Sequence, residues 1–396
     1  MFKLFQSNQM PLLVDAYTQR RASIETAPFS PEIVLVQNHG MGQWLKLELA
    51  QHMGIAANIS AELPGTYITG LYHQFLRTPV EKESAYSRNI LTWHIMDVLN
   101  STGTANKTSN PFLPLINYLD GEGDRDLRLY QLSHQLAGLY EQYLIYRPAW
   151  IHAWDKGAPG PLICQQHPWQ ALLWQEIIRR TDERHRANLH LELLGIIDSI
   201  NPTELPARVS LFGFSSLPPM HFDTFRALAE KVEVDIYFLN PCQHYWGDIV
   251  SPKDIARRSV RDLIEQTSDA ALADEDYMDI GNPLLSSMGK QGREYFELLL
   301  SEESLVDATH FTPSAPNTIL SLLKNDVLNL EFGGSFGAEA QPEKLPHAAN
   351  DSSIRIHSCH SKSREVEVLL DQIYKCCSND PELVPNEIIV MMPDVN

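Results

Sequence analysis

Cysteine is scarce in this chain, and its spacing matches neither a metal site nor a disulfide framework. The five thiols among 396 residues are Cys164, Cys242, Cys359, Cys376 and Cys377. An odd, sparse set is typical of a reducing compartment, so we expect a cytoplasmic protein that binds no metal. Cys376 and Cys377 fall in a stretch with helical spacing, where we expect both to be packing residues.

Long apolar runs are missing as well. No run reaches the ~18–20 residues that a membrane-spanning helix needs. Residues 1–10 have neither the apolar core nor the cleavage site of a signal peptide. We therefore expect no membrane association. With 43% hydrophobic residues, the 396-residue chain can build packed cores, and its length predicts two or three domains of ~100–200 residues each.

Positive charge is also limited, because 31 Lys and Arg oppose 50 Asp and Glu, for a formal net charge of −19. Proteins that coat DNA without sequence preference neutralise many phosphates, so this balance argues against that class but permits a local basic patch. Acidic residues concentrate in 262–303. A basic cluster, for which a solvated helix face is the alternative interpretation, comprises Arg179, Arg180, Arg184, His185, Arg186 and His190.

Residues 32–44 have the frame of a phosphate-binding loop. The β-branched run 33–36 predicts a buried strand, a short turn with Gly40 and Gly42 follows, and helical spacing extends over 44–53. In this frame, backbone N–H groups at the helix start cradle phosphates. An ordinary strand-to-helix turn is the alternative.

The chemistry of such a loop is absent. A working loop continues with a Lys, which neutralises phosphate charge, and a Ser or Thr, which ligates magnesium. Gln43 and Trp44 stand at these positions, and neither can perform these roles. A second buried strand, over 209–212, ends in Phe212 where such ATPases have a magnesium-positioning Asp. The two sites together predict a nucleotide-binding frame that cannot use ATP.

A serine hydrolase is the rival interpretation of the second strand. Gly213, Phe214 and Ser215 begin the G-x-S-x-G pattern of a nucleophile elbow. Leu217 stands where the second glycine should be, so the pattern fails.

The chain alternates strands with helices before and after a long helical stretch. Strands are expected over 2–7, 32–37, 208–213 and 232–239, and helices over 11–25, 40–53 and 220–231. This alternation predicts an α/β domain with a parallel sheet. Residues from about 66 to 200 have helical periodicity, and their tryptophans Trp150, Trp154, Trp169 and Trp174 are expected in a core. A helical insertion that splits an α/β domain explains this order.

The last part of the chain predicts a second α/β unit. Residues 333–350 are rich in Gly, Ala, Pro and Asn and are expected to form a linker. A strand over 354–358, a helix over 363–377 and a strand over 388–392 follow. A domain ordinarily continues past its second strand, so we expect a truncated chain.

Several stretches together resemble RecC, the gamma chain of bacterial exodeoxyribonuclease V. They are VLVQ at 34–37 with Gly40 and Met41, GIAANI at 54–59, QYL at 142–144 with YRP at 146–148, HRANL at 185–189, NPC at 240–242 with YWGD at 245–248, and GNPLL at 281–285. The likeness runs from residue 1 to 396, and the chain is similar to the N-terminal part of this longer family.

The resemblance implies the fold of a superfamily 1 helicase, P-loop NTPase-like, with a degenerate ATP site. Residues 1–75 and 205–335 would form domain 1A, split by a 1B-like helical insertion at 76–204. Residues 336–350 would be the linker, and 351–396 the start of a truncated 2A-like domain. The degenerate nucleotide site would comprise Gly40, Gly42, Gln43, Trp44 and Phe212.

The resemblance also implies a function. The chain would be a non-catalytic, DNA-binding subunit that works with RecB-like and RecD-like subunits of the ATP-dependent nuclease. It would hold forked double-stranded DNA, channel single strands and recognise Chi during double-strand break repair by homologous recombination. ATP and magnesium are then expected only in the partner subunits.

By resemblance, the Chi-reading surface comprises Gln37, His39, Gln43, Leu63, Leu139, Gln142, Arg147 and Arg186. Gln can pair with a base edge, Arg suits guanine or phosphate, and Leu can wedge against an unstacked base. Three positions depart from the family pattern and bear on sequence preference: Thr69 for Trp, Gly138 for Asp and His39 for Thr. The structural alternatives are core packing for Leu63 and Leu139 and helix capping for Arg147.

Other functions remain as alternatives. An active nucleotide hydrolase with an atypical loop would need a Lys or Arg from elsewhere near Gly40. A pure assembly scaffold would use Arg147 and Arg186 for protein contacts. A nuclease centre at 274–276 is disfavoured, because this acidic run lacks a nearby Lys and a strand setting.

Overall fold

The computed structural model describes residues 2–22, 30–77, 84–102, 110–121, 123–161, 166–182, 184–251, 281–301, 306–332 and 351–392. The chain forms two compact units, Met1–Thr312 with Val327–Phe332, and Pro313–Asp326 with Gly333–Asn396. Cys164, the acidic run 274–276 and the predicted linker 336–350 lie outside the described residues.

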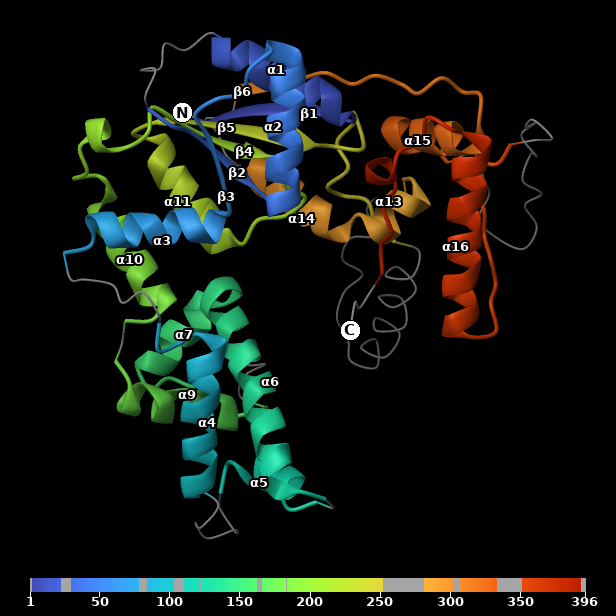
Figure 1. The fold of residues 1–396 in the computed structure, drawn as a ribbon. Helices are drawn as coiled ribbons and strands as arrows, with labels where there is room; N and C mark the ends of the chain where they lie inside the picture. The colour runs from blue at the N-terminus through green and yellow to red at the C-terminus, as the bar shows by residue number, and fades with distance from the viewer. Residues whose placement is uncertain are drawn as a thin grey trace, which may run out of the picture. The chain divides into compact units, whose positions relative to one another are not determined.

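The first unit is built on a parallel sheet (Figure 1). Its strands are β1 (Phe2–Ser7), β2 (Glu32–Val36), β3 (Ile59–Glu62), β4 (Arg208–Phe212), β5 (Glu233–Leu239) and β6 (Val306–Thr309). They form one six-stranded sheet in the order β3-β2-β4-β5-β1-β6, and every pairing is parallel. The predicted α/β class with a parallel sheet is therefore confirmed.

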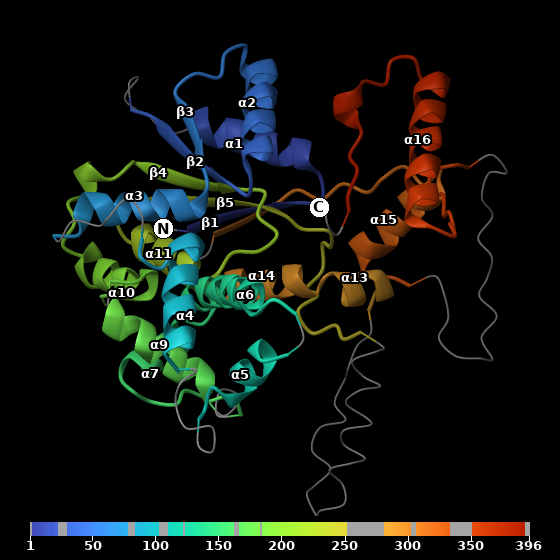
Figure 2. The ribbon, with the colours of Figure 1, turned by 60° about the horizontal axis from the view of Figure 1, so that its bottom comes forward.

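Helices cover both faces of this sheet (Figures 1 and 2). One face packs against α1 (Met10–Ala22) and α2 (His39–Met53) through side chains that include Val34, Val36 and Phe212. The other face packs against α3 (Pro64–Phe75), α11 (Pro219–Ala229) and α14 (Lys290–Leu300). Alternate residues of β2 point to opposite faces, and because both faces are covered the strand is apolar and buried at every position after Glu32.

A helical subdomain follows β3 and α3 in the chain. It contains α4 (Arg88–Thr102), α5 (Leu113–Leu119), α6 (Arg125–Tyr146), α7 (Pro148–Asp155) and α9 (Trp169–Arg180). The next helix, α10 (Arg186–Ile197), packs through Leu189, Leu193 and Ile197 in the core that α3 and α11 share with the sheet. Trp154 and Trp174 are fully buried in its core, and Trp150 and Trp169 pack against them. The expected core position of all four tryptophans is confirmed. Asp124 starts α6 by accepting the N–H groups of Asp126 and Leu127.

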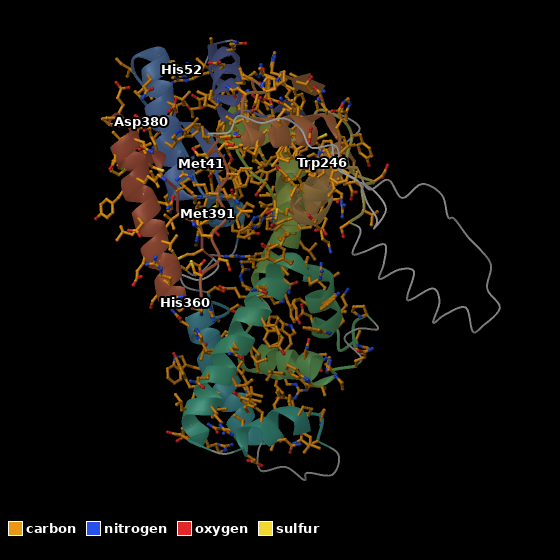
Figure 3. The ribbon with its side chains drawn as sticks, turned by 90° about the vertical axis from the view of Figure 1, so that its right-hand side faces the viewer. Met41, His52, Trp246, His360, Asp380 and Met391 are labelled. Atoms are coloured by element: carbon orange, nitrogen blue, oxygen red, sulfur yellow. The ribbon has the colours of Figure 1, made fainter. Side chains whose placement is uncertain are left out.

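A short 3-10 helix (Pro202–Glu204) precedes β4, and α13 (Pro283–Met288) precedes α14. Beside α14, Trp246 of the YWGD stretch packs in the core of the first unit (Figure 3). Its ring stacks on Phe296 at 5.5 Å, and its Nε1 donates to Asn240 Oδ1 at 3.0 Å. Trp246 of this stretch therefore has a packing role.

The second unit contains α16 (Lys362–Asn379), which matches the predicted helix, and a 3-10 helix (Pro385–Glu387). Figure 3 marks the two ends of α16 with His360 and Asp380. The predicted strands 354–358 and 388–392 are wrong, because neither stretch pairs with another strand among the described residues. Their apolar side chains are exposed instead, Ile356 by 92% and Ile389 by 79%.

The remaining helix, α15, spans Ile319–Asn329. The packing role expected for Cys376 and Cys377 is also wrong, because both lie exposed on α16. Cys242 is a buried thiol of the first unit, and burial raises its pKa. Among the described residues, no helix is both long and apolar enough to span a membrane.

Candidate functional site

The junction between β2 and α2 is shorter than the sequence suggested. The Asn38 side chain accepts the Met41 N–H at 2.9 Å and caps a helix that already begins at His39. Gly40 and Gly42 therefore lie within the helix, as the helix expected over 40–53 requires, whereas the turn expected at these glycines from the loop frame is wrong. Figure 3 shows Met41 and His52 toward opposite ends of this helix.

Gly42 has a packing reason for being glycine. A Cβ at this position would lie 2.9 Å from the Ala61 Cβ and 3.4 Å from Val36 Cγ2. The missing side chain lets α2 approach β2 and β3 closely, as a glycine does where a helix packs tightly on a parallel sheet. Gly40 is less constrained, since its nearest neighbour would be Asn38 Oδ1 at 3.2 Å.

Two residues predicted to replace magnesium-binding groups lie beside each other. Trp44 comes from α2 and Phe212 from the end of β4, and their ring centroids are 6.4 Å apart. Phe212 is completely buried, with Tyr17 at 6.2 Å and Tyr237 at 5.5 Å. Aromatic rings from α1, α2, β4 and β5 thus pack together at this place.

The carboxyl edge of the sheet carries four of the residues predicted to contact DNA, here called the edge group: Gln37, His39, Gln43 and Leu63. The first three are exposed, and Leu63 is half-buried where β3 leads into α3. Gln37 Nε2 donates to Ser215 Oγ, beyond β4, at 3.4 Å. Because all strands are parallel, their carboxyl ends meet here, the usual ligand-binding edge of such sheets.

The other four predicted residues, here called the helical group, are Leu139, Gln142, Arg147 and Arg186. Gln142 and Arg147 are exposed, whereas Leu139 packs against the core of the helical subdomain. The Arg147 guanidinium lies over the Trp150 ring at 5.6 Å, and its backbone N–H caps α6. Within the described residues, no hydrogen bond, ion pair or ring contact joins the helical group to the edge group.

The basic cluster does not form one patch. Arg179 pairs with Glu176 at 2.6 Å, Arg184 with Glu192 at 3.7 Å, and Arg180 with Asp97. His185 and His190 are buried. Arg186, at the start of α10, is the guanidinium of this cluster that has no carboxylate partner in the part of the chain that is described.

Buried His185 instead forms a polar centre in the helical subdomain. Its Nε2 lies 2.9 Å from Asp155 Oδ2, and Trp174 Nε1 donates to Asp155 Oδ1 at 2.8 Å. Burial opposes ionisation of Asp155, but the hydrogen bonds from His185 and Trp174 outweigh it and lower the carboxyl pKa. The centre ties α7, α9 and α10 together.

His221, in the first turn of α11, is a neighbour of Arg186 that sequence analysis missed. Burial, the Arg186 charge and His190 lower its pKa to about 4, so the ring is neutral at physiological pH. Ser215, which stands at the nucleophile position of the failed G-x-S-x-G pattern, instead accepts the hydrogen bond from Gln37. Both contacts join segments far apart in the chain, and no local pattern signals them.

The opposite edge of the sheet carries a buried charge network. Glu32 and Arg208 start neighbouring strands and are ion-paired, and Arg20 Nε donates to Asp235 Oδ2 at 3.0 Å. Burial raises the Asp235 pKa, although Arg20 and Arg208 oppose this. The network ties α1 to three strands, which is a structural role.

Comparison with known proteins shows which family the chain is related to. A family sequence model for "RecC, N-terminal domain" matches residues 2–330. The chain is 34% identical over 423 aligned positions to the "RecBCD enzyme subunit RecC" of Escherichia coli (strain K12), covering 100% of this chain and 37% of that protein. The subunit of the same name from Haemophilus influenzae is 31% identical, and the alignment covers 100% of this chain and 38% of that protein. The one from Mycolicibacterium smegmatis is 28% identical, and the alignment covers 99% of this chain and 33% of that protein.

The match with the family model covers most of the chain and includes the whole sheet described above. The chain spans only about a third of the length of these curated relatives, 37%, 38% and 33% respectively. It belongs to the RecC family, with which it shares the N-terminal domain.

Proposed function

We propose that this chain is a non-catalytic, DNA-binding part of a RecBCD-type helicase–nuclease. It guides unwound single strands from a forked duplex and recognises Chi during double-strand break repair by homologous recombination. RecB-like and RecD-like subunits would be its partners and would supply the ATP and magnesium chemistry. Membership of the RecC family supports this assignment, and the contact between Trp44 and Phe212 carries the non-catalytic part of it.

The proposed fold is that of a superfamily 1 helicase without ATPase activity. Residues 1–75 and 205–335 would be domain 1A, 76–204 a 1B-like insertion, 336–350 a linker and 351–396 the start of a 2A-like domain. A parallel sheet with helices on both faces supports the 1A assignment. A separate helical core supports the insertion.

The degenerate nucleotide site would lie at Gly40, Gly42, Gln43, Trp44 and Phe212. Two aromatic rings lie where this frame would require a magnesium-binding hydroxyl and a carboxylate. Asn38 accepts the Met41 N–H, a backbone donor of the kind that would otherwise face a phosphate. Gln43 adds no positive charge. These features disfavour an active nucleotide hydrolase.

Strand recognition would use the edge group and the helical group. Gln37, Gln43 and Gln142 present exposed amides that can pair with base edges. Arg186 has no carboxylate partner among the described residues, so its guanidinium is free to contact guanine or phosphate. The loss of ATP chemistry at Gln43 would thus make the same edge available to a nucleobase.

The test is a double substitution, Gln43→Ala with Arg186→Ala, in the full complex. We expect weaker single-strand binding and loss of the Chi response, with the subunits still assembled. The matched control is Gln51→Ala with Arg179→Ala, because Gln51 is exposed on the same helix and Arg179 is exposed and paired with Glu176. If strand binding and Chi response both survive the first pair, the chain is a pure assembly scaffold.

A further inference from the structure

Three aromatic side chains form a row on the surface of the helical subdomain, here called the aromatic row: exposed Trp93 of α4, exposed Tyr130 of α6 and half-buried His134 of α6. The Tyr130 and His134 rings are 6.0 Å apart and only 16° from parallel. Trp93 lies 6.2 Å from Tyr130. Trp93 is 63% exposed and Tyr130 43% exposed, whereas Trp154 and Trp174 of the same subdomain are fully buried. Core packing therefore does not explain the row.

Hydrogen bonds from buried and backbone groups hold one end of the row. His134 Nδ1 lies 3.4 Å from the hydroxyl of Thr92, which is 2% exposed and donates to the Arg88 carbonyl at 2.6 Å. Arg88 Nε in turn donates to the His134 carbonyl at 3.4 Å. The His134 ring is therefore positioned before any ligand arrives, which lowers the entropic cost of binding.

A cation lies at the same end. Arg88 is exposed and has no carboxylate partner within the described residues. Its guanidinium lies over Gly138, where a Cβ would be 3.2 Å from Arg88 Nε. Asp97, one turn beyond Trp93, is paired with Arg180, so its charge is compensated. The exposed neighbours Asn89, Gln131 and Gln135 are polar and uncharged.

The row is continuous with the helical group. Tyr130, His134, Gly138 and Gln142 follow at intervals of four residues along α6, so they form one ridge on the helix surface. At 1.5 Å per residue this ridge is roughly 18 Å long, enough for several unstacked nucleotides. Gln142 at its far end is one of the residues proposed to contact DNA.

We propose that the aromatic row stacks the unpaired bases of a single strand and that Arg88 contacts the adjacent phosphate. The inference rests on the proposed function and extends its DNA path along α6. Surface rings beside a cation without a carboxylate partner suit a single strand, because every base offers a π-face and every nucleotide a charged phosphate. Stacking tolerates any base, so this segment holds the strand without reading it.

The experiment measures binding of a fluorescein-labelled oligo(dT) to the chain by fluorescence anisotropy. We expect Trp93→Ala with Tyr130→Ala to raise Kd by about tenfold or more. Trp93→Phe should retain most of the affinity because it keeps a stacking ring. The control is Tyr118→Ala, because Tyr118 is a similarly exposed tyrosine, 52%, in the same subdomain. Unchanged unfolding midpoints by circular dichroism establish that the variants fold.

Salt dependence separates stacking from charge. Arg88→Ala should reduce the magnitude of the slope of log K against log salt by about 0.7, the value for one phosphate contact on a single strand. The aromatic substitutions should leave that slope unchanged. Equal slopes for Arg88→Ala and the unaltered chain would remove the phosphate contact from the proposal.

Three other results would overturn the inference. They distinguish failure of the aromatic row alone from failure of the proposed DNA-binding function. Normal oligo(dT) binding by the aromatic variants, with weakened binding by Gln43→Ala and Arg186→Ala, rejects the row alone. Normal binding by the aromatic variants with lost association with a partner subunit makes the row a protein contact. No single-strand binding by the unaltered chain rejects both proposals.

Discussion

Trp44 of α2 and Phe212 of β4 place two aromatic rings where a magnesium-binding site would need polar side chains. The first is partly buried and the second completely buried, and their rings are neighbours. A carboxylate in the position of Phe212 would need a cation or several hydrogen bonds to remain charged there. Phe212 instead lies in an apolar cluster with the rings of Tyr17 and Tyr237, which carry no positive charge.

Phe212→Asp tests whether this position can still hold a magnesium carboxylate. We expect a loss of more than ~4 kcal/mol in the free energy of unfolding, because the substitution buries an unpaired acid and leaves a cavity. Phe212→Leu, which keeps an apolar side chain, should cost only about 1–1.5 kcal/mol. Urea unfolding followed by circular dichroism measures both. Equal stability of the two variants would mean that the site is open and polar.

His221 predicts a pH dependence of stability. Its pKa is about 4 in the folded chain, because of burial and the nearby Arg186 and His190, against about 6.5 when unfolded. Between these values the unfolded chain binds the extra proton, so stability falls as pH falls from about 6.5 to 4, by on the order of 3 kcal/mol from this ring.

Chemical unfolding across that pH range is the measurement for His221. His221→Gln should flatten the fall in stability, whereas His73→Gln, at an exposed histidine of α3, should leave it unchanged. A fall of the same size in both variants would assign the effect to other groups. Direct observation of the ring by nuclear magnetic resonance gives its pKa independently.

At the scale of elements, close packing of α2 on β2 and β3 depends on Gly42. Gly42→Ala should destabilise the chain by roughly 1 kcal/mol, because overpacking against Ala61 exceeds the gain in helix propensity. Gly70→Ala should have the opposite effect, a stabilisation of up to about 1 kcal/mol, since a Cβ at Gly70 meets nothing within 4 Å. Thermal unfolding of both variants measures the difference, and two changes of the same sign would contradict this packing role.

Elements with several buried apolar residues were predictable from sequence, and short or unpaired ones were not. The apolar runs of β1, β2, β4 and β5 identified the centre of the sheet. The edge strands β3 and β6 were missed, since each has only four residues. Stretches 354–358 and 388–392 failed for the converse reason, because a β-branched run becomes a strand only with a neighbour to pair with.

Part of the candidate site was also predictable from sequence, and part of it was not. Gln37 came from the resemblance alone, whereas the missing Lys and Asp of a phosphate-binding loop pointed to Gln43 and Phe212. The start of α2 was displaced because the Asn38 cap competes with a wider turn. His221 beside Arg186 and the alignment of Trp93 with Tyr130 arise from contacts between distant segments, which periodicity cannot reveal.

At the scale of the whole molecule, a net charge of −19 requires DNA contacts to be few and local. Arg88, Arg147 and Arg186 have no carboxylate partners within the described residues. Three phosphate contacts on a single strand predict a slope of log K against log salt of about −2. Oligo(dT) titrations at several salt concentrations measure this slope. A value steeper than about −5, seven or more contacts by the same relation, would require an extensive basic surface instead.

Calorimetric titration of the chain with ATP in the presence of magnesium tests most directly the proposal that the carboxyl edge of the sheet cannot bind ATP. Aromatic rings at Trp44 and Phe212 and the Asn38 cap predict no binding heat at millimolar ATP. Saturable binding at micromolar ATP that depends on magnesium would contradict the proposal and identify the chain as a working nucleotide-binding protein.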